Sequence, residues 1–228
     1  MLKHIPNLLT ISNLICGCVA LYFTFHNQMV VAAYLIGLAA IFDFMDGAAA
    51  RLLNVSGPMG KELDSLADMV SFGVVPGSVV FHLLAPSSLN AYSFVALLIP
   101  ALSAYRLAKF NVDQRQTTHF IGLPTPANCL FFVSIPLIIT FQKESGLAHL
   151  MGSPEIIILF TVLMSLAMIS EITLFSLKFK SLKFADNKLR FVFLVTSIVL
   201  LAVLQFSAIP MIVLLYVLAS IIFKPKSS

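Results

Sequence analysis

Charged side chains are scarce in this chain. Of its 228 residues only 11% are Asp, Glu, Lys or Arg, whereas 59% are hydrophobic, and the mean hydropathy is +0.99. Soluble domains carry about 25% charged residues, which keep their surfaces in water. The composition therefore excludes a soluble protein and predicts an integral membrane protein that crosses the bilayer several times.

Cysteine is also scarce. Cys16, Cys18 and Cys129 are the only three, and all lie in apolar segments. An odd number of buried thiols is typical of small core residues and indicates neither a disulfide framework nor a zinc site. The five histidines are spread along the chain and form no ligand cluster. No internal repeat is recognisable, which disfavours a transporter built from inverted repeats.

Apolar runs predict eight membrane-spanning helices. Their expected ranges are 6–25, 29–50, 61–85, 90–109, 124–142, 155–177, 189–206 and 208–223. Every Lys and Arg except Lys143 falls at the chain ends, in the connections 2–3, 4–5 and 6–7, or at the adjoining helix ends. By the positive-inside rule, both termini and these connections should lie on the cytosolic side.

We therefore expect an all-α helical bundle embedded in the cytoplasmic membrane of a prokaryotic-type cell. Residues 1–228 should form one integral membrane catalytic domain, with a motif core over 1–130 and additional helices over 131–228. Nothing in the sequence indicates a soluble appendage or a nucleic-acid partner. The lipid bilayer is the expected surrounding.

Acidic residues are the rarest charges, and half of them gather in one stretch. The chain has ten Asp and Glu residues, and five lie between positions 43 and 68. They are Asp43, Asp46, Glu62, Asp64 and Asp68. A carboxylate inside a bilayer costs about 2.5–3.5 kcal/mol on insertion scales and marks a functional site by default. Neighbouring carboxylates also repel each other unless a cation lies between them.

The spacing of four of these acids predicts a metal site. Asp43 and Asp46 are three residues apart, and Asp64 and Asp68 are four apart, so each pair shares a helix face. Two such helices would direct four carboxylates into one pocket. All-oxygen ligation suits Mg²⁺ or Mn²⁺, and a two-metal site is a known arrangement for displacement at phosphorus. The alternative, charged helix ends that only reach toward water, leaves the two face-sharing pairs unexplained.

Small residues accompany the acids. Gly47 and Ala50 share the face of the first pair, and Gly60 shares the face of the second. They leave room for a bulky ligand near the backbone. Arg51 offers a planar guanidinium suited to phosphate. The arrangement predicts a diphosphate held between metal ions and an arginine.

The stretch resembles the signature of the CDP-alcohol phosphotransferase family, D-x2-D-G-x2-A-R-x8-G-x3-D-x3-D. All eight positions match in identity and spacing: Asp43, Asp46, Gly47, Ala50, Arg51, Gly60, Asp64 and Asp68. The resemblance implies the fold of that family and transfer of a substituted phosphate from a CDP-linked donor to an alcohol, with release of CMP. It also implies that the four aspartates hold two divalent ions, that Asp68 is in addition the general base, and that the four other positions border the CDP moiety.

The first expected span carries a polar stripe that includes Asn7 and Thr10. Two interpretations stay open for it. In one, the side chains form hydrogen bonds with a neighbouring helix. In the other, they contact the nucleotide. We include both residues among the candidate CDP contacts.

Three further segments resemble the phosphatidylserine synthase branch of the family. They read I-P-N-L-L-T-I-S-N-L-x-C-G from Ile5, R-L-A-K-F-N from Arg106 and F-I-G-L-P-x-P from Phe120. This resemblance implies CDP-diacylglycerol as donor, L-serine as acceptor, and a homodimer. Arg106 and Lys109 are candidates for holding the serine carboxylate, although interfacial anchoring would explain them equally well.

Ser71 is a third candidate acceptor contact, because it shares a helix face with Asp64; capping of backbone freed near Pro76 is the other interpretation. The main alternative function is the same chemistry with another acceptor, glycerol phosphate or inositol phosphate. Such an acceptor should require a more basic pocket. A divalent-cation transporter that uses the aspartates as its path is a remote alternative.

Overall fold

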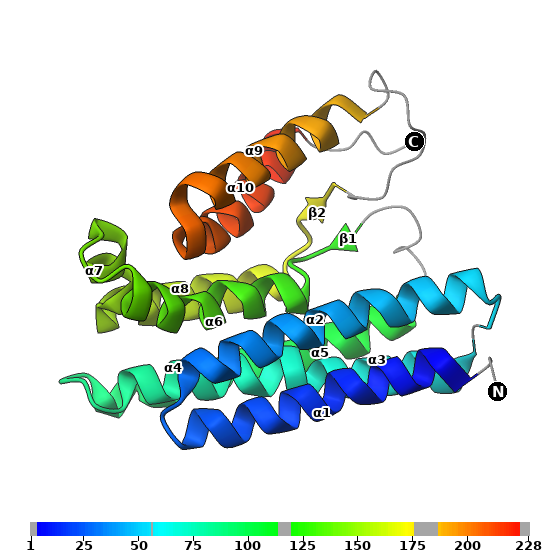
Figure 1. Ribbon diagram of the computed structural model, residues 1–228, viewed down its shortest axis with the longest axis horizontal. Helices are drawn as coiled ribbons and strands as arrows, with labels where there is room; N and C mark the ends of the chain where they lie inside the picture. Colours follow the sequence, from blue (N-terminus) through cyan, green and yellow to red (C-terminus); the bar gives the residue numbers. More distant parts are fainter. Residues whose placement is uncertain (1–3, 56, 114–119, 176–186, 224–228) are drawn as a thin grey trace.

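The computed structural model describes residues 4–55, 57–113, 120–175 and 187–223, and these are almost entirely helical (Figure 1). The α-helices are α1 (Ile5–Phe25), α2 (Met29–Leu52), α3 (Pro58–Asp68), α4 (Val75–Leu84), α5 (Leu98–Val112), α6 (Thr125–Phe141), α7 (Gly146–Gly152), α8 (Pro154–Ile169), α9 (Lys188–Leu204) and α10 (Ala208–Ile222). Shorter elements are the π-helix η2 (Met69–Val74), the 3₁₀-helices η3 (Asn90–Leu97) and η5 (Gln205–Ser207), and the strands β1 (Phe120–Ile121) and β2 (Thr173–Leu174). The expected all-α polytopic fold is confirmed.

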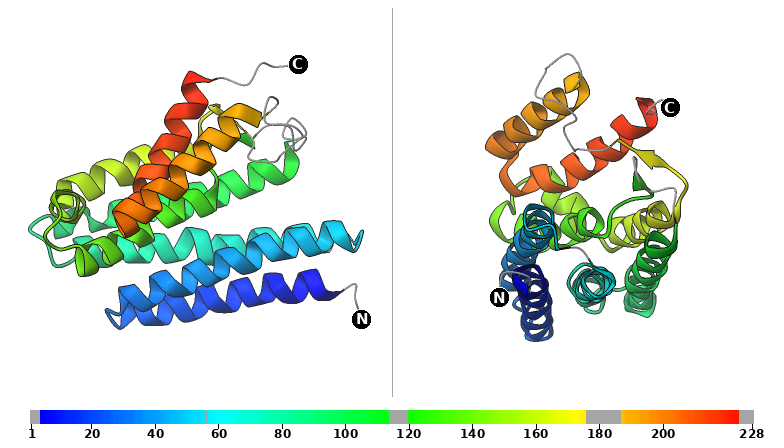
Figure 2. Two further views of the ribbon diagram at one scale, coloured as in Figure 1. Left: turned by 45° about the horizontal axis from the view of Figure 1, so that its top comes forward. Right: turned by 90° about the vertical axis from the view of Figure 1, so that its right-hand side faces the viewer.

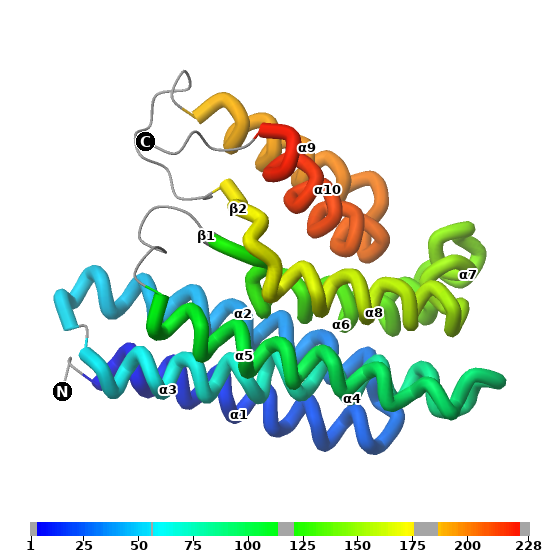
Figure 3. The backbone as a smooth tube through the Cα atoms, turned by 180° about the vertical axis from the view of Figure 1, so that it is seen from behind, coloured from blue at the N-terminus to red at the C-terminus, as the bar shows by residue number. Residues whose placement is uncertain are grey.

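The span formed by α3, η2 and α4 lies at the centre of the bundle. It contacts α1, α2, α5, α6 and α8, and the end-on view in Figure 2 shows it among its neighbours. Figure 3, which views the molecule from behind, shows α5 running alongside this central span. The α9–α10 hairpin lies outermost and packs through α10 on α6 and β2. The central span therefore positions residues from most of the other helices.

The expected count of eight spans is not confirmed. Within the described residues, five helical stretches are long and apolar enough to cross a membrane, or six if α7 and α8, bent by 74°, form one span. A straight span needs about 20 residues. α6 has 17 residues, and α9 and α10 have 17 and 15. α9 and α10 are long enough to cross a membrane only when they are counted together, as the stretch Lys188–Ile222.

The chain reverses between α9 and α10 at Gln205, whose φ is 51° and ψ −124°. Gln142, just after α6, holds this turn. Its Nε2 donates to the carbonyl of Leu204 at 3.0 Å, and its Oε1 accepts from the backbone N–H and hydroxyl of Ser207 at 2.9 and 2.8 Å. The side-chain amide of Gln142 thus fixes the hairpin to the end of α6.

The sixth expected span, 155–177, is too long at its C-terminal end. α8 ends at Ile169, and Thr173 and Leu174 form β2, which pairs antiparallel with β1. Gly122 follows β1 with φ +76°, a conformation that favours glycine. The last two residues of the expected span, and the cations expected at Arg115, Lys178, Lys180, Lys183, Lys224, Lys226 and Lys3, lie outside the described residues.

The central span widens to a π-helix over Met69–Val74, immediately after Asp68. Pro76 has no backbone N–H, so a regular helical hydrogen bond is missing there. The side chain of Ser71 donates to the carbonyl of Asn13 in α1 at 3.0 Å, while its own carbonyl lies 3.6 Å from the thiol of Cys129 in α6. The π-helix is therefore joined to α1 and α6, next to the acidic stretch.

Gly17 marks the closest approach of α1 to η2. A Cβ there would lie 2.3 Å from Oγ and 2.9 Å from Cα of Ser71. We expect Gly17→Ala to lower the free energy of unfolding by about 1–3 kcal/mol, because the helices must separate to admit the methyl group. Thermal unfolding in detergent measures this. Gly37→Ala, on α2 with nothing within 4 Å, is the matched control; equal midpoints for both variants would contradict the expectation.

Candidate active site

Three of the predicted metal ligands converge where α2 faces α3. One carboxylate oxygen from each of Asp43, Asp64 and Asp68 lies within 4.8 Å of the other two. Asp68 is buried, and Oδ1 of Asp64 has no hydrogen-bond partner among the described residues. Three converging carboxylates, one with an unpaired buried oxygen, have the donor chemistry that hard divalent cations prefer. The residues present therefore fit a metal site.

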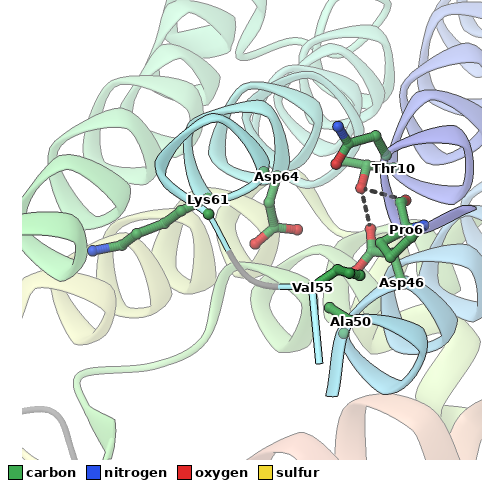
Figure 4. Close-up of a pocket in the computed structure, with 11 residues that line it drawn as sticks. Pro6, Thr10, Asp46, Ala50, Val55, Lys61 and Asp64 are labelled. Carbon is green, nitrogen blue, oxygen red and sulfur yellow. Dashed lines mark hydrogen bonds between the residues drawn. The ribbon is translucent and has the colours of Figure 1, made fainter. Parts of the chain in front are cut away.

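Donors from α1 orient two of the aspartates. The hydroxyl of Thr10 lies 2.7 Å from Oδ2 of Asp46, as Figure 4 shows, and 3.0 Å from the carbonyl of Pro6. Nδ2 of Asn13 donates to Oδ1 of Asp68 at 3.3 Å. Asp46 is thus the one predicted ligand outside the group of three, held toward α1. The polar stripe on α1 bonds to the neighbouring aspartates, as one of the two interpretations expected.

A cavity of about 250 Å³ lies between α1, α2 and the start of α3. It is lined by five of the six candidate CDP contacts: Asn7, Thr10, Gly47, Ala50 and Gly60. We call it the small cavity. Added Cβ atoms at Gly47 and Gly60 would lie 3.6 Å from a guanidinium nitrogen of Arg51 and 3.5 Å from the amide oxygen of Asn7, which are ordinary van der Waals contacts. Figure 4 shows Asp46 and Asp64 among the side chains that line the small cavity.

A second cavity of about 450 Å³, the large cavity, lies on the other side of the same acids. All four signature aspartates line it, together with residues of α5 and the start of α6. Its apolar lining consists of Phe44, Leu107, Phe110, Pro124 and Pro126. Asp46, Gly47, Lys61 and Asp64 line both cavities. The two cavities therefore meet at the carboxylates.

The candidate basic residues divide between different environments. Arg51, which was expected beside CDP, lines the large cavity and not the small one. One of its guanidinium nitrogens lies near Gly47, which lines both. Arg106 also lines the large cavity, is only 8% exposed, and its Nε has no partner within the described part of the chain. Lys109 lines neither cavity and forms an ion pair with Glu171, with 2.6 Å between Nζ and Oε1.

Ser71, the third candidate acceptor contact, also lines neither cavity. It is fully buried and bonds to α1. Its hydroxyl joins η2 to the carbonyl of Asn13 on α1, a role that neither interpretation anticipated.

Sequence reasoning missed a polar link beside the large cavity. Nζ of Lys61 donates to the carbonyl of Asn111 at 2.6 Å, and Nδ2 of Asn111 donates to the hydroxyl of Ser65 at 2.9 Å. The link joins α3 to α5, and Figure 4 shows Lys61 directed away from Asp64. In the sequence, the only indication of this link was Lys61 itself, which follows Gly60 at a position where the signature accepts any residue.

A family model described as CDP-alcohol phosphatidyltransferase matches residues 3–173, which include every residue that lines the two cavities. The chain belongs to the CDP-alcohol phosphatidyltransferase family. The matched region of this phosphatidyltransferase includes α8 and ends before α9 and α10. Membership removes the support for the cation-transporter alternative.

Three relatives of this protein have the same name. It is 35% identical over 161 residues to the CDP-diacylglycerol–serine O-phosphatidyltransferase of Bacillus subtilis (strain 168), covering 67% of this chain and 88% of that protein. It is 33% identical over 170 residues to the enzyme of that name from Helicobacter pylori (strain J99), covering 73% and 70%. The enzyme of that name from Saccharomyces cerevisiae is 40% identical over 104 residues, covering 42% of this chain and 37% of the yeast protein.

Proposed function

We propose that the protein transfers the phosphatidyl group of CDP-diacylglycerol to the hydroxyl of L-serine, giving phosphatidylserine and CMP. The observation that carries the proposal is the meeting of two cavities at one group of carboxylates. A donor in one cavity and an acceptor in the other would bring their reacting atoms together at the aspartates. The names of the relatives support serine as the acceptor.

The small cavity is the proposed nucleotide site. Its glycines let a ligand approach the backbone of α2 and α3, and Asn7 and Thr10 add polar groups from α1. The diphosphate would then extend toward Asp46 and Asp64, which line both cavities. Arg51, which lines the large cavity and has a guanidinium nitrogen near Gly47, is the proposed phosphate contact at the junction.

Asp43, Asp46, Asp64 and Asp68 are the proposed ligands of two divalent ions, Mg²⁺ or Mn²⁺. When bound, such ions neutralise the diphosphate and stabilise the leaving CMP. The protein contributes the orientation of the ligands. Thr10 fixes Asp46 and Asn13 fixes Asp68, so neither carboxylate needs to reorganise when the substrate binds.

Asp68 is the proposed general base. It lines the large cavity and not the small one, so it faces the proposed acceptor rather than the nucleotide. In the step that consumes serine, its carboxylate takes the hydroxyl proton as the serine oxygen bonds to the phosphatidyl phosphorus, and the bond from that phosphorus to the bridging diphosphate oxygen breaks, so that this oxygen leaves with CMP. Asn13 holds one oxygen of Asp68, which leaves the other for this role.

Glycerol phosphate or inositol phosphate would bring an additional phosphate into the large cavity. Of the cations considered for that phosphate, Lys61 is bonded to Asn111, and Lys109 is paired with Glu171 outside the cavity. Among the described residues, the cations that line it are Arg51, Arg106 and Lys61, and Lys61 keeps its charge while it donates to a neutral carbonyl. The modest positive charge favours an acceptor with a single carboxylate over one with a phosphate.

We further propose that both cavities open at the cytosolic face of the membrane and that the protein is a homodimer. The start of α1, the α2–α3 connection and the end of α5 lie at one end of the bundle (Figure 1). Arg51, Lys61, Arg106 and Lys109 belong to this end, whereas Lys143 follows α6 at the opposite end. The distribution supports a cytosolic position for the cation-rich end.

The decisive experiment measures CMP release by purified protein from CDP-diacylglycerol. It compares reactions with and without L-serine, with Mg²⁺ or Mn²⁺, and with EDTA, and it identifies the lipid product. Serine- and metal-dependent release with phosphatidylserine as product would support the proposal. Release with glycerol phosphate or inositol phosphate, and not with serine, would keep the family chemistry and replace the acceptor.

Gly47→Leu tests the nucleotide site. The side chain would extend into the small cavity, so we expect the affinity for CDP to fall at least about tenfold, equivalent to 1.4 kcal/mol. Titration of CDP into folded protein measures it. Gly37→Leu makes the same change on the same helix, where an added Cβ meets nothing within 4 Å. Unchanged CDP affinity in Gly47→Leu would argue against the assignment of the small cavity.

A further inference from the structure

Several buried polar atoms around the large cavity lack partners. Within the described residues, Asp64, Arg106 and Thr125 each have an unpaired buried side-chain atom, and all three line this cavity. A buried polar atom without a partner is unfavourable, and such groups in one cavity indicate a polar ligand. Asp64 belongs to the metal site. Arg106 and Thr125 remain for another part of the substrate.

These two residues come from different helices and are both almost fully enclosed. Arg106, on α5, is 8% exposed, and Thr125, the first residue of α6, is 0% exposed. Nε of Arg106 and Oγ1 of Thr125 have no hydrogen-bond partner among the described residues. Two residues with unpaired buried donors thus line one cavity from separate elements, and one of them carries a fixed positive charge.

The start of α6 adds to their preference for an anion. This helix has 17 residues, and no side chain caps its N-terminus, where Pro124 is the N-cap. Backbone N–H groups of a first helical turn lack intrahelical acceptors, and the helix dipole favours negative charge there. Pro126 removes one of these donors. The hydroxyl of Thr125 is a replacement donor in the same turn.

The charges of the large cavity match an amino acid. Four carboxylates line it, together with Arg106 and Thr125. We infer that Arg106, Thr125 and the N-terminus of α6 form a carboxylate subsite that positions an amino-acid acceptor with its hydroxyl toward Asp68. The inference rests on the proposed function and deepens it, because it assigns acceptor specificity to Thr125. A site that pairs with a particular group rejects analogues lacking it.

Thr125→Val provides the sharpest test. The substitution keeps the shape and removes only the hydroxyl, which has no partner in the described structure, so it should not destabilise the fold. We expect KM for L-serine to rise about fivefold to twentyfold, with KM for CDP-diacylglycerol unchanged. Ser165→Ala is the matched control, because it removes another fully buried, unpaired hydroxyl, on α8, that lines neither cavity.

Ethanolamine supplies a second measurement, because it has the hydroxyl and ammonium of serine but no carboxylate. We expect the wild-type protein to prefer serine by at least about 1000-fold in kcat/KM, and we expect Arg106→Gln to reduce this preference. Direct titration of serine into the CMP-bound protein gives a readout independent of turnover. It should show weaker binding in Thr125→Val than in Ser165→Ala.

The outcomes separate the subsite from the overall function. Wild-type protein that forms no phosphatidylserine would overturn the proposed function and the subsite with it. Active wild-type protein, with equal serine KM and equal serine affinity in Thr125→Val and Ser165→Ala, would overturn the subsite alone. Comparable use of ethanolamine and serine would do the same.

Discussion

Asp64→Asn is expected to lower kcat for phosphatidylserine formation at least about 1000-fold while the bundle stays folded. Asp64 lines both cavities and belongs to the group of three carboxylates. The amide keeps the size of the side chain but removes its charge. Bound divalent ions supply several kcal/mol of transition-state stabilisation, and about 4 kcal/mol corresponds to a factor of 1000.

The control for this variant is Glu62→Gln, which removes an exposed acid two residues away that lines neither cavity. Its turnover should equal that of the wild type. Titration with Mn²⁺ should show a higher metal requirement in Asp64→Asn, because one charged ligand is missing. Turnover within tenfold of wild type at limiting metal would contradict a ligand role for Asp64.

Asp68→Asn is expected to lower kcat about 100-fold to 10,000-fold, the usual contribution of a general base. An asparagine cannot take the acceptor proton, although its carbonyl oxygen can still accept from Asn13. CDP-diacylglycerol affinity should persist, since Asp68 does not line the small cavity. Equilibrium binding of the donor and single-turnover CMP release measure the two effects separately.

Excess metal distinguishes the two aspartates. It should partly restore Asp64→Asn, in which the weakened step is ion binding. It should not restore Asp68→Asn to the same degree, because the missing proton acceptor is unaffected by metal concentration. Normal turnover of Asp68→Asn would rule out its role as the base.

Helical periodicity predicted the two face-sharing pairs of acids, but not that Asp46 would lie outside the group of three. The spacing places Asp43 on one helix face, and Asp64 and Asp68 on a shared face of the next helix. In the structure, one carboxylate oxygen of each lies within 4.8 Å of the other two. Spacing could not separate Asp46 from this group, because its orientation depends on a hydroxyl from α1, 36 residues away. The place of Arg51 at the large cavity likewise depends on how α2 packs.

Hydropathy was less informative toward the C-terminal half. It locates apolar segments, but it cannot show that α8 gives way to a strand paired with β1, since that pairing joins residues far apart in sequence. It also cannot show that Lys109 is paired with Glu171, 62 residues away. Non-local partners of this kind determine which cations remain available to a substrate.

The π-helix after Asp68 sets the phase between two halves of one span. A π-turn holds an extra residue, which corresponds to about 100° of rotation in an α-helix. The first half carries Asp64 and Asp68, which line the large cavity, and the second packs Gly77 so tightly that an added Cβ would lie 2.8 Å from Pro100. Deleting one residue from 69–74 would regularise the helix but turn one half out of register. The length of this segment is therefore constrained by both halves of the span at once.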